Sequence, residues 1–232
     1  MKHRFSLPIF LLNVLLFAMF LSACVPSLVK YPEPLKEKRP SLMYPPGPQL
    51  LASPKYPLKV GVMTAGDKRS VRFWHDADSF FAEEATKGVS EAMGRDLDRS
   101  GIFNEVVRID EQPPAMLTAE VLQRLKDQYG VEMVLIPYLT EFCMPREKSG
   151  NSLYLNTYIV KVRFGMTAQL VYLDNGIVVW ADTVNRMQED LADEGVLAPE
   201  KMGELARGVI KDGVQDMKTL LIQTGKAMKV RR

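Results

Sequence analysis

Residues 158–172 read YIVKVRFGMTAQLVY, and this stretch decides how the rest of the chain is arranged. Every even-numbered residue in it is apolar, whereas the odd positions include Lys161, Arg163 and Thr167. Successive side chains of a strand point to opposite faces of its sheet, so strict alternation predicts one buried face and one wet face. We therefore expect a long strand whose apolar side is covered by helices.

A tight turn follows this strand. Asn175-Gly176 is typical of a type I′ hairpin, because both central residues of that turn need a positive φ. The turn predicts a second strand over residues 177–184. Pairing across a two-residue turn places Val171 opposite Trp180 and Gln169 opposite Asp182.

Apolar residues recur with a strand or helix period elsewhere in the chain. Gly101 and Gly130 are expected to end two helices, and Pro137 inside a strand implies an edge position or a bulge. On the first helix, Glu83/Lys87 and Glu91/Arg95 have the spacing of ion pairs. The expected elements are a strand over 58–64, a helix from Asp76 or Asp78 to about Ser100, a strand over 105–109, a helix capped by Thr118 and ending at Tyr129, a strand over 131–142, and a last helix from about Pro199.

The resulting order is β-α-β-α-β-β-β-α. It predicts an α+β fold: a single domain with a mixed or antiparallel sheet and helices on one face. We expect this domain over residues 58–232. A signal peptide (1–23) and a cysteine with a Pro-rich tether (24–57) are expected to precede it.

The first residues have the parts of an export signal. A basic start (2–4) precedes an apolar run (5–20), and small residues then lead to a cysteine. The stretch Leu21-Ser22-Ala23-Cys24 resembles the lipobox of bacterial lipoproteins. The resemblance implies that a peptidase cuts between Ala23 and Cys24 and that the Cys24 thiol receives a diacylglyceryl group. A membrane-spanning anchor is disfavoured, because the apolar run is short for a span.

The resemblance also implies a location. In many Gram-negative bacteria, the lipoproteins that this stretch resembles stay in the inner membrane when an Asp directly follows the lipidated cysteine. Here Val25 stands at that position instead. We therefore expect the chain on the periplasmic face of the outer membrane, held by its lipid anchor.

Charge and cysteine content exclude two classes of protein. The net charge is +2, and loss of Lys2 and Arg4 with the signal leaves 28 basic against 28 acidic residues. Balanced charge gives no support for a nucleic-acid partner. The chain has two cysteines, so lipidation of Cys24 leaves Cys143 without an intramolecular partner and excludes a disulfide framework. We expect Cys143 to be buried.

Nine of the fifteen prolines lie in residues 25–57, which excludes a helix or a central strand there. One interpretation is a plain extended spacer, reaching on the order of 100 Å at about 3.1 Å per residue. The other is that part of the segment lies along its own domain or a neighbouring copy. Leu42, Tyr44 and Leu51 favour this second interpretation, because they are apolar for a solvated spacer.

A second resemblance concerns the domain. Residues 97–103 (LDRSGIF) resemble the phrase L-x-x-S-G-x-F-x-V of an envelope superfamily, with the valine one position later, at Val106. Its members include the curli-secretion lipoprotein, the Pel-polysaccharide lipoprotein, the activators of peptidoglycan synthases and the amino-terminal domain of TolB. The resemblance covers residues 58–225 in pattern and implies the α+β fold above.

No catalytic, cofactor or metal site is expected, and the chain is not expected to be an enzyme. Residues 61–66 have the glycine spacing of a phosphate loop, but Asp67 follows where phosphate would sit. His75 is the only histidine after the signal, so it has no partner cluster for a metal. Any Ser or Cys nucleophile would also need His75 as its general base, and no recognisable base lies near one in the sequence.

One loop is a candidate partner contact. Lys68, Arg69, Arg72, Phe73 and Trp74 combine three cations with two aromatic rings, which suits a protein partner or an anionic glycan. The alternative is an ordinary loop with Trp74 in the core.

Three functional hypotheses arise from these features. The first is a non-enzymatic scaffold or accessory subunit of an envelope assembly or export machine. The second is a ring-forming export component, which would be a homo-oligomer. The third, a cell-wall or polysaccharide enzyme, is disfavoured because no catalytic group emerges.

Overall fold

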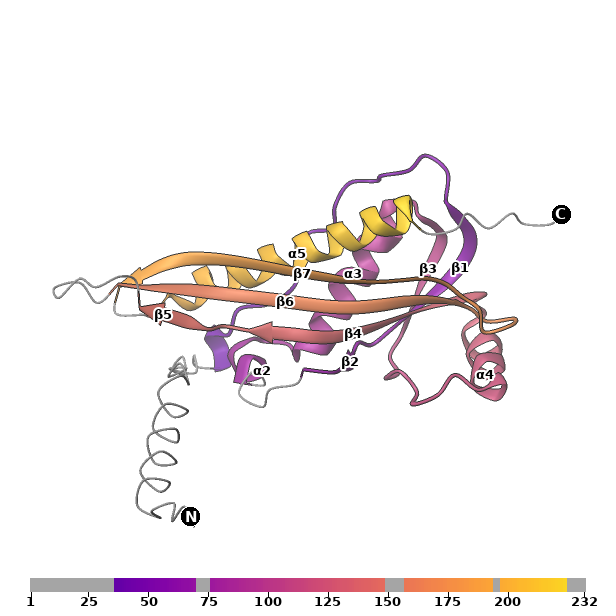
Figure 1. Cartoon of the computed structure of the whole chain (residues 1–232), viewed down its shortest axis with the longest axis horizontal. Helices are drawn as coiled ribbons and strands as arrows, with labels where there is room; N and C mark the ends of the chain where they lie inside the picture. Colours follow the sequence, from indigo (N-terminus) through magenta and orange to yellow (C-terminus); the bar gives the residue numbers. More distant parts are fainter. Residues whose placement is uncertain (1–35, 70–75, 149–156, 194–196, 225–232) are drawn as a thin grey trace, which may run out of the picture. The chain divides into compact units, whose positions relative to one another are not determined.

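A computed structural model describes residues 36–69, 76–148, 157–193 and 197–224, which belong to one compact unit, Tyr31–Arg232. A sheet forms its centre, and α3 and α5 pack against one face (Figure 1). This is the α+β arrangement that the sequence predicts. The elements are η1 (Lys36–Lys38), β1 (Tyr56–Met63), β2 (Gly66–Asp67), α2 (Asp76–Phe80), α3 (Ala85–Ser100), β3 (Phe103–Ile109), α4 (Ala119–Tyr129), β4 (Met133–Cys143), β5 (Arg146–Lys148), β6 (Thr157–Tyr172), β7 (Val178–Asp193) and α5 (Pro199–Gln223).

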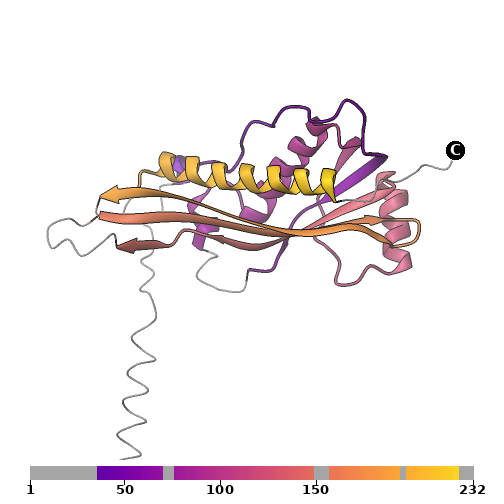
Figure 2. The ribbon, with the colours of Figure 1, turned by 45° about the horizontal axis from the view of Figure 1, so that its top comes forward.

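The sheet is mixed. β1 pairs in parallel with β3 and β4, whereas β6 pairs antiparallel with β4 and β7. The short strands β2 and β5 extend it, β2 beside β4 and β5 beside β6. Within the described residues, β3, β2, β5 and β7 each pair with one strand only, so they form the edges of the sheet. α5 runs along β6 and β7, as Figure 2 shows.

The alternation in β6 is confirmed. Its even positions from Val160 to Leu170 are at most 2% exposed and face α3 and α5. Phe164 shows how closely α5 approaches: a Cβ at Gly213 would lie 2.5 Å from its ring. A glycine of the helix therefore faces the largest buried side chain of this strand, and the core is closed between them.

The register of the hairpin differs from the prediction by one residue. Leu170, not Val171, lies opposite Trp180. The loop is longer than a two-residue turn: Tyr172 N donates to Ile177 O, and Gly176 N donates to Tyr172 O. A one-residue shift moves side chains to the other face, and here it carries Trp180 to the helix side, where it is 5% exposed.

The first helix is broken in two, where a single helix was expected. α2 ends at Phe80 and α3 begins at Ala85. Asp78 caps the second helix from outside by accepting a hydrogen bond from Ala85 N at 3.0 Å. Neither expected ion pair forms: Glu83 binds residues near the N-terminus of the domain, and Lys87 pairs with Glu84. Glu91 pairs instead with Arg108, and Arg95 donates to the Tyr44 carbonyl.

Pro137 lies in an inner strand, so the edge position expected for it is wrong. It faces Ala168 of β6 and falls between Leu135, the last β4 residue paired with β1, and Tyr138, the first paired with β2. The missing amide hydrogen thus falls at a gap between two neighbouring strands. The bulge that proline also implied lies just beyond, between Leu139 and Glu141.

A smaller core lies under α4. It contains Val134 and Ile136, which alternate along β4 with residues of the main core and so face the opposite side. The predicted ends of α4 are confirmed: the Thr118 hydroxyl accepts from Val121 N at 3.4 Å, and Gly130 has φ 60°. Lys126 of α4 also pairs with Asp174 in the hairpin loop.

An ion pair near α4 predicts a pH dependence. Hydrogen bonds from Arg124 and from the Tyr129 hydroxyl lower the pKa of Glu111 to about 2, against an ordinary value of 4.5. Because the folded pKa is depressed, this stabilisation is complete above pH 4.5 and is lost as the pH falls toward 2. The Glu111 side chain is 30% exposed, so we expect at most about 1 kcal/mol.

Urea unfolding of Glu111→Gln against pH measures this effect. The variant should be less stable than the wild type at neutral pH, and the difference should vanish near pH 2. Arg124→Gln should show the same convergence. A difference that is constant over this range would show that Glu111 has an ordinary pKa.

Candidate functional site: the docked N-terminal strap

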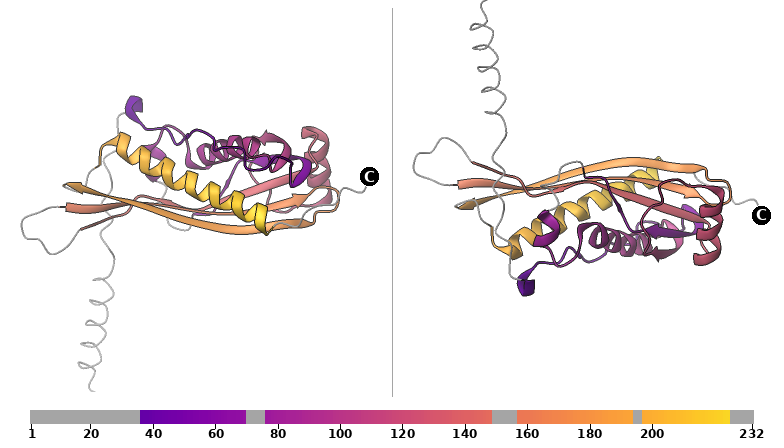
Figure 3. Two further views of the ribbon diagram at one scale, coloured as in Figure 1. Left: turned by 90° about the horizontal axis from the view of Figure 1, so that it is seen from above. Right: turned by 90° about the horizontal axis from the view of Figure 1, so that it is seen from below.

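Residues 41–51, which we call the strap, pack on the domain without joining the sheet. Leu42 is 0% and Tyr44 4% exposed, and both belong to the main core. The strap lies along α3 and α5 on the helix-covered side of the sheet (Figure 3). Of the two interpretations of the Pro-rich segment, packing on its own domain therefore describes these residues.

The first residues of the strap are fixed from two sides, by the break before α3 and by α5. The Ser41 hydroxyl and Leu42 N donate to the Glu83 carboxylate, the latter at 2.9 Å. Arg207 of α5 donates to the Ser41 carbonyl at 2.9 Å. Glu83 lies in the break between α2 and α3, so the interruption of the helix supplies the acceptor that holds the strap.

The centre of the strap lies over a buried ion pair. Lys218 Nζ is 3.0 Å from Asp96 Oδ2, and their side chains are 0% and 2% exposed. The other oxygen, Asp96 Oδ1, accepts from Gly47 N at 2.6 Å. A Cβ on Gly47 would lie 3.0 Å from Asp96 Oδ1 and 3.2 Å from Lys218 Nζ. Glycine thus lets the backbone of the strap approach the pair closely.

Tyr44 lies beside the same pair. Burial raises the pKa of Tyr44, and the negative charge of Asp96 raises it further. The phenol therefore stays protonated, which keeps a third charge out of this buried cluster. Arg95 Nη2 donates to the Tyr44 carbonyl at 3.0 Å, so α3 binds the strap backbone at this residue as well.

The last residues of the strap close over the end of α3. Leu50 N and Leu51 N both donate to the Ser100 carbonyl, at 2.9 and 3.2 Å. Gly101 follows with φ 74°, and a Cβ there would lie 2.5 Å from Leu51 O. Lys55 then donates to the carbonyls of Leu221 and Ile222 at the end of α5, where a cation is favourable.

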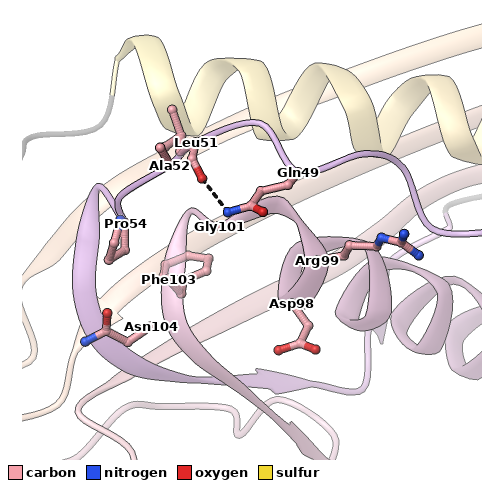
Figure 4. Close-up of a pocket in the computed structure, with 9 residues that line it drawn as sticks. All are labelled: Gln49, Leu51, Ala52, Pro54, Asp98, Arg99, Gly101, Phe103 and Asn104. Carbon is pink, nitrogen blue, oxygen red and sulfur yellow. Dashed lines mark hydrogen bonds between the residues drawn. The ribbon is translucent and has the colours of Figure 1, made fainter.

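A hollow of about 300 Å³ lies where the strap ends (Figure 4). The end of the strap and the residues Ala52 and Pro54 that follow it form one wall, and the turn from α3 into β3 forms the other. Gln49 donates across the strap side to Leu51 O at 2.8 Å. The lining residues are Gln49, Leu51, Ala52, Pro54, Asp98, Arg99, Gly101, Phe103 and Asn104.

The site residues expected from the sequence are only partly described. Ala23, Cys24, Arg72, Phe73 and Trp74 lie outside the described residues. Lys68 is exposed, and its Nζ lies 3.6 Å from the centroid of the Tyr138 ring. It is therefore a cation on the surface, at the beginning of the loop that was singled out.

Arg69 differs from the exposed contact residue that the loop composition suggested. Its side chain is 1% exposed and binds Asp67 and Asp78 at 2.6 and 2.8 Å. Burial lowers the pKa of Arg69, but the hydrogen bonds of the two carboxylates outweigh it and raise the pKa overall. The guanidinium thus fixes the base of the loop to α2 and is not available to a partner.

Three further observations concern the described residues. Cys143 is buried, as expected, and burial raises the pKa of its thiol to about 12. Within the described ranges, no group of three or more His, Cys, Asp or Glu side chains gathers as a metal site would require. Among the helices of those same ranges, none combines the length and apolarity of a membrane span.

Sequence reasoning missed the strap latch, the set formed by Gly47, Asp96 and Lys218, although a signal was present. Lys218 stands in the apolar stripe of α5, four residues after Val214 and three before Leu221. Asp96 likewise interrupts the stripe of α3. A charge on each of two apolar stripes indicates a buried pair, because an unpaired charge is rarely buried.

Comparison with known proteins finds likeness in structure only. No protein-family model matches the sequence, and no curated protein matches it. A DUF330-family protein from Xanthomonas campestris has a TM-score of 0.47 at 13% identity, over 77% of this chain and 89% of that one. The PelC dodecamer from Paraburkholderia phytofirmans has a TM-score of 0.37 at 18% identity, covering 72% and 93%.

A third similar structure is lipoprotein B from Nitrosomonas europaea. Its TM-score is 0.38 at 12% identity, and the match covers 77% of this chain and 94% of that one. The chain thus resembles proteins that include bacterial lipoproteins. At these identities the likeness concerns the fold alone.

Proposed function

We propose that the chain is an outer-membrane-anchored periplasmic lipoprotein that acts as a non-enzymatic scaffold or accessory subunit of a cell-envelope assembly or export machine. The observation that carries this proposal is the stretch Leu21–Cys24, which ends an export signal in a cysteine. The docked strap supports it, because hydrogen bonds join the segment that follows Cys24 to the folded domain.

The mechanism of such a protein is placement. Acyl chains on Cys24 fix one end in the membrane, and two or three chains are needed for a stable anchor. Because the strap is docked and the Pro40 carbonyl also accepts a hydrogen bond from Ala82 N, the tether outside the domain shortens to residues 25–39. Its reach is then about 50 Å at about 3.1 Å per residue, half of what a plain spacer would give.

The strap also orients the domain on its tether. It begins beside the first turns of α5, where Arg207 donates to the Ser41 carbonyl, and it ends at the last residue of α3. Lys55, which follows the strap, binds the last turn of α5. The tether therefore leaves at the N-terminal end of α5. The surface around α4 and the hairpin loop lies at the other end of the sheet (Figure 1), and it is free to meet a partner further from the membrane.

The loop after β2 is the second contact surface that we propose. Lys68 is exposed at its start, and Arg72, Phe73 and Trp74 follow in the sequence. Arg69 anchors this loop instead of contacting the partner.

The anchor is tested by Cys24→Ser in the full-length protein. We expect the variant to move from the membrane pellet to the soluble fraction, whereas the wild type stays with the membranes. Cys143→Ser is the matched control, because it removes the other thiol without touching the anchor. A Cys24→Ser protein that still sediments with the membranes would refute lipid anchoring.

A ring-forming export component is the second candidate. One observation favours it: within the described residues the outer edge of β7 has no partner strand, and Met187 and Leu191 on that strand are 49% and 62% exposed. Exposed strand edges pair readily with other chains. Native mass spectrometry separates the two functions, because a discrete high oligomer favours the ring and a monomer favours the accessory subunit.

A further inference from the structure

We propose that the strap is releasable, so that the protein has two tether lengths. In the docked state the tether is residues 25–39, because Pro40 O accepts from Ala82 N. In the released state the tether extends to the hinge at residues 52–55. At about 3.1 Å per residue, release lengthens the reach from about 50 Å to about 95 Å. The use of these two lengths rests on the proposed anchor at Cys24, whereas release itself does not.

The first argument is that the strap is not woven into the sheet. The strap forms hydrogen bonds with side chains, as Leu42 N does with Glu83, and with the carbonyl of Ser100 at the end of α3, as Leu50 N does. β1 begins only at Tyr56. The contacts of α3 with β3, and of α5 with β6 and β7, are made without the strap. Release therefore leaves the sheet and its two helices in place.

The second argument concerns the latch. A buried ion pair recovers little free energy beyond the desolvation of its two charges, so it is an inefficient way to fix a segment permanently. Asp96 and Lys218 become hydrated when the strap leaves, and they remain paired with each other. A groove lined by such a pair tolerates water, whereas a purely apolar groove would not.

The third argument is that a hinge is present. Ala52 and Ser53 are exposed between the strap and Lys55, whose ammonium is fixed to the end of α5. Bending there frees residues 41–51 without disturbing β1. The released strap regains conformational entropy, which favours the released state by on the order of 1 kcal/mol per residue. This gain offsets part of the free energy that the burial of Leu42 and Tyr44 contributes to the docked state.

Native-state hydrogen exchange on the mature lipidated protein in vesicles tests release. The reporters are the strap amides with partners, those of Leu42, Gly47, Leu50 and Leu51. They should share one protection factor, at least tenfold below that of the β6 amides, because they open without global unfolding. Equal protection of strap and β6 amides would overturn the proposal, and so would strap amides with no protection at all.

Two further variants separate release from general weakening. Gly47→Ala should lower strap protection and leave β6 unchanged, since its Cβ meets Asp96 and Lys218. Gly94→Ala is the matched control, because nothing lies within 4 Å of its added Cβ. If both alanine variants leave strap protection unchanged, the latch does not hold the strap.

A disulfide completes the test. The Cβ of Leu42 lies 3.3 Å from an ideal Cβ on Gly88, close to the spacing that a disulfide needs. Oxidised Leu42→Cys/Gly88→Cys should bring strap protection up to that of β6, and reduction should restore the difference. Exchange reads the strap whether or not Cys24 is lipidated, so failure here is distinct from failure of the membrane test.

Discussion

Replacing Lys218 with Met should lower the free energy of unfolding by about 3 to 5 kcal/mol, as expected when one partner of a buried pair is removed. Asp96 is left charged at 2% exposure, with only Gly47 N at hydrogen-bond distance. Opening of the strap limits the loss, because water then reaches the carboxylate. Urea unfolding followed by circular dichroism measures the difference.

The matched double variant separates charge from packing. Asp96→Asn with Lys218→Met removes both charges and keeps an oxygen that can accept from Gly47 N. Most of the lost stability should return, because neutral side chains carry no large desolvation penalty. If the double variant is as unstable as Lys218→Met alone, the loss comes from the packing of α5 and the latch is not electrostatic.

Replacing Phe164 with Ala should cost about 3 to 5 kcal/mol, the usual range for a fully buried Phe. Its ring is 0% exposed and fills the space above Gly213, where α5 crosses β6. Since glycine has no side chain to move into the cavity, the two elements cannot easily close it. The same urea experiment reports the change.

Gln169→Ala is the control for this core variant, because it lies on the same strand and on the other face. We expect it to cost less than about 1 kcal/mol. A small effect of Phe164→Ala, comparable with that of the control, would mean that α5 does not pack on β6 as described.

The alternation in β6, together with the amphipathic helices around it, was sufficient to predict an α+β fold, because the apolar faces of strand and helices must cover one another. The hairpin register was not predictable in the same way. Asn175-Gly176 correctly located the turn, but its length depends on the pairing of Tyr172 with Ile177 and on the Asn175 side chain, which accepts from Ile177 N. These contacts form only when the strands meet.

The break between α2 and α3 shows the same limit. Helical spacing continues through Phe81 and Ala85, and the sequence has no proline or glycine there to end the helix. Glu83 leaves the helix because it binds Ser41 and Leu42, far away in the chain. The periodicity of a local stretch contains no information about a residue that is distant in the chain and contacts it only in the folded protein.

The strap was hidden by its composition. Five prolines within residues 40–54 exclude helix and central strand, but they do not tell whether the segment is solvated or packed. Gly47 fits against Asp96 and Lys218, which lie on different helices, so the latch becomes visible only when the three residues are brought together. Lys218 and Asp96, each in an apolar stripe, were the local signs of it.

The central claim is that lipid on Cys24 anchors this domain, and the mass of the N-terminal peptide tests it most directly. Protein purified from membranes should yield a first peptide that begins at Cys24 and carries a diacylglyceryl group on its sulfur, with or without an acylated amine. An N-terminal peptide that begins upstream of Cys24, or one that begins at Cys24 with an unmodified thiol, would contradict the account.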